Sequence, residues 1–336
     1  MAITALRKIT LGRETNAGTA VATTAVWRGP ASTFGELPER VMVNENIGYM
    51  VQTDRGYFPT ASSALAFPET EATFEQILHV FEAGLHTEAS ITANGGTSNA
   101  YIYNYLPSTT TPLTLKNYTI EAGDEQQCYE QEYSYVREFS LSGAPNQAVM
   151  LSSVWPGRQR TKATATAGLT APTVEEILFN RGTLFMDAVG GTMGGTQITG
   201  SWLGFDMTCK TGWTPIYSGD GQLYYTSLKN VGPEITGSIT FEYNSNGVAV
   251  EDLFAAGTTR LIRHSFAGSA TGVTGTGGTY TARRFMYDFA AQITSVDPLD
   301  SQDGNDVLKI NYKAVYQPTW TKFAEFIVCN LLSAVP

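Results

Sequence analysis

The segment that decides the fold of this chain is residues 11–30, LGRETNAGTAVATTAVWRGP, in which a strand-like start leads into a long run of small and polar residues before Trp27. A second segment of this kind, LFMDAVGGTMGGTQITGSWLG, occupies residues 184–204 and carries Trp202. Trp202 follows Trp27 by 202 − 27 = 175 positions, about half of the 336 residues. The recurrence indicates an internal repeat.

A helix pattern recurs at almost the same separation. In TFEQILHVFEAG, residues 73–84, the apolar residues fall at i, i+3, i+4 and i+7, which is one face of a helix. Thr73 and Gln76 match a capping box, and Gly84 supplies a stop.

The second copy of this pattern is NGVAVEDLFAAG, residues 246–257, with Asn246 at the expected cap. Phe254 follows Phe81 by 254 − 81 = 173 positions. We therefore expect two repeats, residues 1–165 and 166–336, each with one flanking helix. The residues expected to be equivalent anchors are Trp27 with Trp202, and Phe81 with Phe254.

Most of the remaining chain has the two-residue alternation of half-buried strands. The fold class that we expect is mainly β, with two tandem β-sandwich or barrel domains. The expected strands are 132–143, 148–155, 235–243, 285–295 and 308–316, with a hairpin turn at 218–222, a linker at 161–176 and long loops at 51–73, 86–112 and 268–281.

The charge balance disfavours a nucleic-acid-binding protein. The chain has 21 basic and 31 acidic residues, a net charge of −10, whereas tight binding to phosphates requires Lys and Arg. Its three cysteines form no CxxC pair, and we interpret them as free thiols in a reducing compartment. The N-terminus has no apolar signal-peptide core, and no apolar run is long enough to span a bilayer, so we expect a protein made in the cytoplasm with no membrane partner.

No motif indicates catalysis, a cofactor or a metal. The three histidines belong to no catalytic motif: His79 is expected on a helix surface, His86 after that helix, and His264 in a strand. The acidic run 297–306 lacks the ligand spacing of an EF-hand, and GTGG at 275–278 lacks the context of a phosphate loop, so both are interpreted as turns or loops. We expect no enzyme activity and no cofactor.

The N-terminal segment resembles that of tail tube (major tail) proteins of long-tailed bacteriophages. The resemblance is strongest over residues 5–30 and is carried mainly by Gly12 to Ala20. It implies a β-sandwich with one flanking helix, and a structural virion protein whose rings stack into a hollow tube for genome delivery. Single-domain members usually form hexameric rings, so a duplicated chain implies a homotrimeric, pseudo-hexameric ring.

The partners implied by this resemblance are other copies of the chain, a tail terminator, a tape measure protein and baseplate or tip proteins. Phage DNA would pass through the tube without specific binding, in a virion tail assembled in the host cytoplasm. A trimer would carry 3 × (−10) = −30 charges, and acids in the channel would repel phosphates. The candidate channel strands are 38–53 and 203–217, the latter with the hairpin that follows it, and the candidate channel acids are Glu39, Glu45, Asp206 and Asp220.

Two alternatives stay open. Another ring component of the tail, such as a terminator or baseplate hub, would form rings that do not stack. A carbohydrate-binding β-protein would present aromatic-lined loops and bind glycans saturably.

Overall fold

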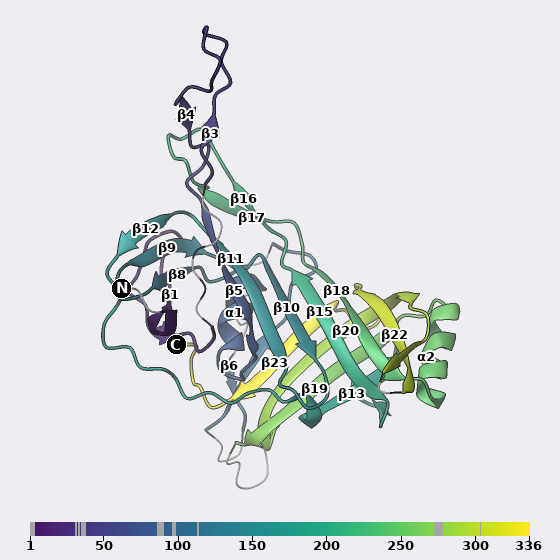
Figure 1. Ribbon diagram of the computed structural model, residues 1–336. Coiled ribbons are helices and arrows are strands. Elements are labelled where there is room, and N and C mark those ends of the chain that lie inside the picture. The colour runs from purple at the N-terminus through teal and green to yellow at the C-terminus, as the bar shows by residue number, and fades with distance from the viewer. Residues whose placement is uncertain are drawn as a thin grey trace.

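The computed structural model describes residues 4–30, 32, 34, 38–85, 91–95, 99–112, 114–271, 278–302 and 304–336. The described chain is mainly β, as the sequence predicts, with α-helices α1 (Ile77–Gly84) and α2 (Ser245–Ala255) (Figure 1). Two short 3₁₀ helices, η1 (Thr4–Leu6) and η2 (Phe179–Arg181), complete the helical segments of this part.

The strands of the first half are β1 (Lys8–Arg13), β2 (Ala25–Val26), β3 (Val41–Met42), β4 (Gly56–Tyr57), β5 (Ser63–Glu71), β6 (Ile91–Ala93), β7 (Tyr101–Tyr105), β8 (Tyr118–Gly123), β9 (Cys128–Ser134), β10 (Glu138–Gly143), β11 (Met150–Gly157) and β12 (Arg160–Ala163). Those of the second half are β13 (Gly182–Ala188), β14 (Gln197–Ile198), β15 (Trp202–Lys210), β16 (Trp213–Ile216), β17 (Ser227–Asn230), β18 (Glu234–Glu242), β19 (Arg260–Ala270), β20 (Ala282–Val296), β21 (Asp300–Gln302), β22 (Asn305–Ala314) and β23 (Ala324–Asn330).

Strand pairing follows the same order in the two halves. The sheet order β2–β1–β8–β9–β12 of the first half corresponds to β14–β13–β19–β20–β23 in the second. Likewise β5–β11–β10 corresponds to β18–β22–β20, so the long strand β20 takes the place of both β9 and β10. The break in the first half falls at residues 135–137, just after Ser134, and the nearby Tyr133 has a backbone φ of 54°. This correspondence supports an internal repeat, while the boundary between residues 165 and 166 stays a prediction.

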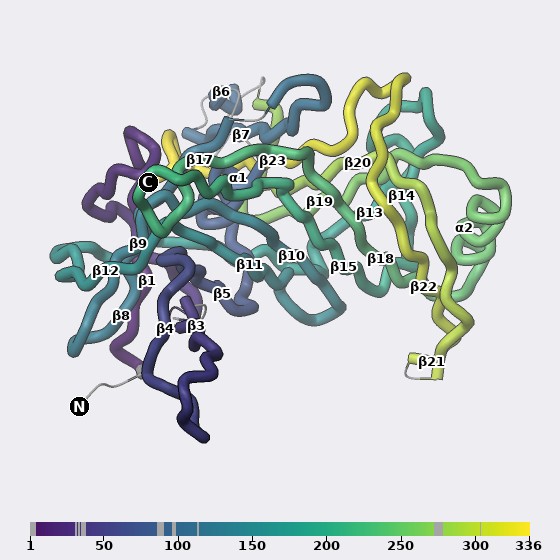
Figure 2. Tube along the Cα trace, turned by 90° about the horizontal axis from the view of Figure 1, so that it is seen from above, coloured from purple at the N-terminus to yellow at the C-terminus, as the bar shows by residue number. Residues whose placement is uncertain are grey.

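The two halves are joined into one sheet by β10 and β15. These strands pair in antiparallel register from Glu138 with Lys210 to Gly143 with Phe205. Seven strands then run side by side in the order β5–β11–β10–β15–β18–β22–β20, and the view from above shows most of them crossing the molecule in turn (Figure 2). A shared hydrophobic core lies behind this sheet and includes residues of both halves.

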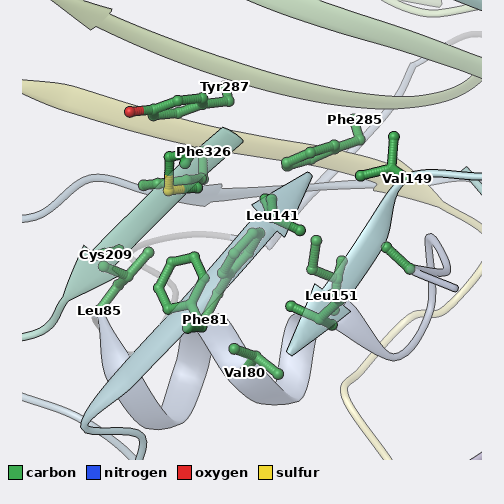
Figure 3. Packing of buried hydrophobic residues seen from close by; sticks show 14 of the residues in the cluster. Val80, Phe81, Leu85, Leu141, Val149, Leu151, Cys209, Phe285, Tyr287 and Phe326 are labelled. Atoms are coloured by element: carbon green, nitrogen blue, oxygen red, sulfur yellow. The ribbon is translucent and has the colours of Figure 1, made fainter. Parts of the chain in front are cut away.

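Helix α1 lies in the centre of this core, and all its residues are buried. The ring of Phe81 lies 5.5 Å from that of Phe139 on β10. It also lies 4.9 Å from that of Phe326 on β23 (Figure 3). Phe285 on β20 lies 6.0 Å away, so strands of both halves surround this one side chain. The predicted apolar face therefore underestimates the burial, because Tyr118 on β8 and Arg13 on β1 cover the side of the helix that carries His79 and Glu82.

The helix starts differ from the predicted ones. Only half of the capping box forms: the backbone N–H of Gln76 donates to the Thr73 hydroxyl, but the Gln76 amide donates to the carbonyl of Val26 and so anchors the segment before Trp27. In α2 the cap is Asn244, two residues before the expected Asn246, and its side chain accepts the N–H of Asn246.

Three other expectations are corrected by the pairing. Residues 63–71 form strand β5 within the expected loop 51–73, and residues 132–143 form two strands instead of one. Residues 38–53 are not a long strand: only Val41–Met42 is paired, with β4. The side chains of this segment are largely exposed, so it has no buried face to hold it in a sheet.

Residues 38–60 form an arm instead, and residues 211–232, which include β16 and β17, form a second arm at the corresponding place in the repeat. Both arms extend from the same end of the large sheet (Figure 1). They touch through the carbonyl of Leu223, which accepts the hydroxyl of Thr60 at 3.0 Å. Just after the first arm, the same carbonyl accepts the N–H of Ala61 at 2.7 Å, and the hydroxyls of Tyr217 and Ser62 lie 3.0 Å apart.

The different burial of the two repeat-equivalent phenylalanines gives a stability prediction. Phe81 is fully buried, whereas Phe254 on α2 is 39% exposed. We expect Phe81→Ala to lower the free energy of unfolding by about 3–5 kcal/mol because it leaves a core cavity. Phe254→Ala should cost about 1 kcal/mol or less. Urea unfolding of the two variants at low protein concentration measures this, and equal losses would contradict the central place of α1.

Candidate assembly and channel surfaces

The open face of the seven-stranded sheet is mainly polar, although Met150 and Val154 on β11 also lie on it, and we call this face the polar wall. The antiparallel register places hydroxyl and amide side chains of neighbouring strands beside one another. One row consists of Ser152, Ser140, Thr208, Thr236, Lys313 and Gln292. The next row consists of Ser142, Asp206, Ser238, Asn311 and Ser295.

These side chains bind one another across the strands. The hydroxyls of Ser140 and Thr208 lie 3.1 Å apart, and the Asn311 amide donates to the Ser295 hydroxyl at 2.9 Å. The residues between them in sequence, such as Leu141, Met207 and Ile239, are buried in the core. The alternation therefore separates a wet face from a dry face, as expected for a sheet with one solvated side.

Charges on the polar wall alternate in sign. Lys210 is paired in register with Glu138 on one side and Glu234 on the other. The ammonium of Lys313 lies 2.5 Å from a carboxylate oxygen of Glu234. Such a surface offers phosphates no continuous basic patch, so it has little capacity to hold nucleic acid.

Only one of the four candidate channel acids lies on the polar wall. Asp206 is exposed on β15 and accepts a hydrogen bond from Ser238 at 3.3 Å. Glu39 is exposed at the base of the first arm, and Glu45 lies within that arm in an ion pair with Arg55. Asp220 lies in the turn of the second arm, where it accepts from Ser218. Sequence reasoning placed them together because it interpreted both arms as wall strands.

Two buried carboxylates organise the Gly/Thr runs with which the repeats begin. Glu14 accepts the backbone N–H groups of Gly18 at 2.6 Å and Tyr133 at 2.7 Å, and burial raises the pKa of this carboxyl. Asp187 is also buried, and it accepts the backbone N–H groups of Gly194, Gly195 and Thr196 at 2.7–3.1 Å.

Sequence reasoning noticed these runs but not their acids. The available signal was an acidic residue at the start of each run, Glu14 in the first and Asp187 in the second. The position of Gly12 also requires a glycine, because an added Cβ would lie 2.9 Å from the carbonyl oxygen of Ala22. The loop can fold back onto β1 only where no side chain intervenes.

The two predicted tryptophan anchors pack in their own halves. Trp27 is buried with its ring 4.9 Å from that of Phe67 on β5. Trp202 lies 4.5 Å from the ring of Phe179 and donates its indole N–H to the carbonyl of Gly204. Each tryptophan therefore holds the strand that follows a Gly/Thr run against the core.

The described histidines are enclosed in the core. His79 is buried, which corrects its expected place on a helix surface, and its Nδ1 lies 3.3 Å from the hydroxyl of Tyr118. His264 lies in β19, as predicted, among aromatic rings that include Trp202 and Phe205. Burial lowers the pKa of each to about 3, and the nearby Arg13 also lowers that of His79. Both imidazoles are thus neutral packing groups in the folded protein.

The remaining candidate sites form no cluster of metal-binding side chains within the described residues. No group of three or more His, Cys, Asp and Glu side chains there is placed to hold a metal ion. The acidic run 297–306 contributes β21, which pairs with β22; Asp303 of this run, most of GTGG at 275–278, and His86 lie outside the described residues. Among the described helices, none has the length and apolar character needed to cross a membrane.

Comparison of the chain with known protein families and with curated proteins finds no match. The geometry of the polar wall, its edges and the arms is therefore what bears on function.

The buried histidines give a prediction about pH. A histidine whose folded pKa is about 3 stabilises the fold fully above its unfolded pKa of about 6.5, and loses that contribution as pH falls between these values. From pH 8 to pH 5 we expect a loss of about 2 kcal/mol from His264. His264→Phe should remove this part of the pH dependence. The free energy of unfolding of this variant at pH 8, where His264 of the wild type is neutral, measures the effect of the packing change alone. A variant whose stability still falls with pH as steeply as that of the wild type would show that His264 is not the source of the loss.

Proposed function

We propose that this chain is a structural subunit of a bacteriophage tail, which assembles into rings that stack as a hollow tube for genome delivery. The observation that carries the proposal is the polar wall: one mainly hydrated face over seven successive strands, which ends at β5 on one side and at the partly paired β20 on the other. In a closed ring this face lines a channel, and the duplicated halves of three chains supply six similar units.

The polar wall suits a channel through which DNA must pass without adhering. Its hydroxyl and amide groups are already engaged with one another, and its lysines alternate with carboxylates. A polyanion therefore gains little from leaving water to contact it. The chain's net charge of −10 acts in the same direction.

The arms supply contacts along the tube axis. The first arm ends in exposed apolar side chains, with Tyr49 72% and Val51 76% exposed, next to Met50. Exposed apolar clusters of this kind mark interaction sites. We propose that this tip binds the adjacent ring and converts separate rings into a tube.

Electron microscopy of the purified protein after days at high concentration tests the function. We expect tubes or stacked rings with threefold or pseudo-sixfold end views. Rings that never stack would instead indicate a terminator or baseplate hub. Persistent monomers that bind a glycan array saturably would replace the proposal with a carbohydrate-binding function.

A variant of the arm tip separates stacking from ring formation. Replacing Tyr49, Met50 and Val51 with Ser removes the apolar tip without touching the core. We expect single rings in place of tubes, seen by microscopy and by a lower sedimentation coefficient. Leu6→Ser, at a residue 51% exposed outside the arms, is the control and should still form tubes. Tubes of normal length from the arm variant would exclude the arm as the stacking contact.

A further inference from the structure

The two repeat-equivalent helices differ greatly in burial. Every residue of α1 is buried, whereas in α2 only Gly247 and Val250 are buried. The exposed side of α2 includes Val248, 42% exposed, and Phe254, 39% exposed. Since the helices occupy the same place in the strand order of their halves, the difference must come from what covers them.

Part of the cover over the end of α1 comes from the other half of the chain, next to Val136 of its own half. The indole N–H of Trp213 on β16 donates to the carbonyl of Gly84 at 3.0 Å. Thr211 follows β15, and its methyl group lies 3.1 Å from where a Cβ of Gly84 would be. At the corresponding end of α2, no described atom beyond its chain neighbours lies within 4 Å of such a Cβ on Gly257, so this position faces open space in the described part of the chain.

The strand edges beside the two helices differ in the same way. β10 is paired on both sides, with β11 and with β15. The corresponding part of β20, from Gln292 to Val296, is paired with β22 on one side, and no described strand pairs with its other side. Open edges of this kind favour pairing with another chain.

The other end of the seven-stranded sheet is β5, whose described pairing is with β11 alone. Its counterpart β18 is paired on both sides, with β22 and β15. The chain after Trp27 follows the outer side of β5, since a Cβ on Gly29 would lie 3.2 Å from the methyl group of Thr70. This side of the molecule thus corresponds to the β15–β16 corner that covers α1.

We propose that the exposed side of α2 and the open edge of β20 bind the β5 side of a second copy of this chain. This contact between two copies would have the same arrangement as the junction that β10, α1 and the β15–β16 corner form within a single chain. This inference rests on the proposed function for the kind of assembly that forms. The contact itself is inferred from the internal repeat alone. Phe254 and Val248 become buried in this contact, as Phe81 is within the chain.

Charge and symmetry agree with this occupant. α2 carries exposed Glu251 and Asp252, and the segment of a second copy that corresponds to the covering corner carries exposed Arg28 and Arg40. The two binding surfaces are different parts of the molecule, so the contact is heterologous. Heterologous contacts that repeat head to tail close into rings when the rotation permits.

The test is a double variant, Val248→Asp with Phe254→Asp, analysed by mass photometry and sedimentation. Both residues are exposed in the single chain, so we expect a folded monomer in place of rings. The control is Leu6→Asp with Leu331→Asp, at residues 51% and 42% exposed, which makes the same charge change elsewhere. It should assemble like the wild type.

A mixing experiment tests the direction of the contact. The double variant keeps an intact β5 side, so labelled variant should still join wild-type protein and stop its rings from closing. In the wild-type assembly, the backbone amides of Gln292–Val296 should exchange hydrogen at least tenfold more slowly than in the variant.

The outcomes separate this inference from the proposed function. Rings of the double variant equal to wild type, or a wild type that stays monomeric, would overturn the proposed contact. If the wild type forms rings that never stack into tubes, and the double variant forms no rings, the proposed contact is upheld and the proposed tube function is overturned.

Discussion

The backbone ladder between β10 and β15 is the contact on which the rest of the structure depends. It satisfies peptide groups that would otherwise form two open edges, and it joins strands of both halves in one register. That register places Ser140 beside Thr208 on the wet face and Leu141 beside Met207 on the dry face. A slip of one residue would exchange the faces and expose the core.

The same ladder produces the asymmetry between equivalent parts of the repeat. One junction covers α1 and leaves α2 open, because a chain of two units has one internal contact and two free ends. The two ends of the polar wall are unlike, the Gln292–Val296 part of β20 and the β5 side, and the proposed head-to-tail association requires this difference. In the ring that we propose, half of the unit-to-unit contacts are therefore intramolecular.

Much of the fold was predictable wherever a local pattern had one physical meaning. The alternation in 235–243 and 308–316 predicted β18 and β22, and both helices formed near their expected places. The prediction failed where tertiary contacts compete with local ones. Gln76 gives its amide to Val26 and so leaves the capping box incomplete, and His79 is covered by strands that no local pattern reveals.

By itself, the sequence determined the β class, the two helices, the recurrence of the Gly/Thr runs and the low charge, because these depend on residue type and short-range spacing. Only the tertiary structure decided that Glu14 and Asp187 hold those runs and that Asp206 alone of four acids lies on the polar wall. It also decided that Phe81 is fully buried while Phe254 is partly exposed. These properties depend on which strand edges meet, and strand pairing joins residues far apart in the chain whose spacing leaves no periodic signal.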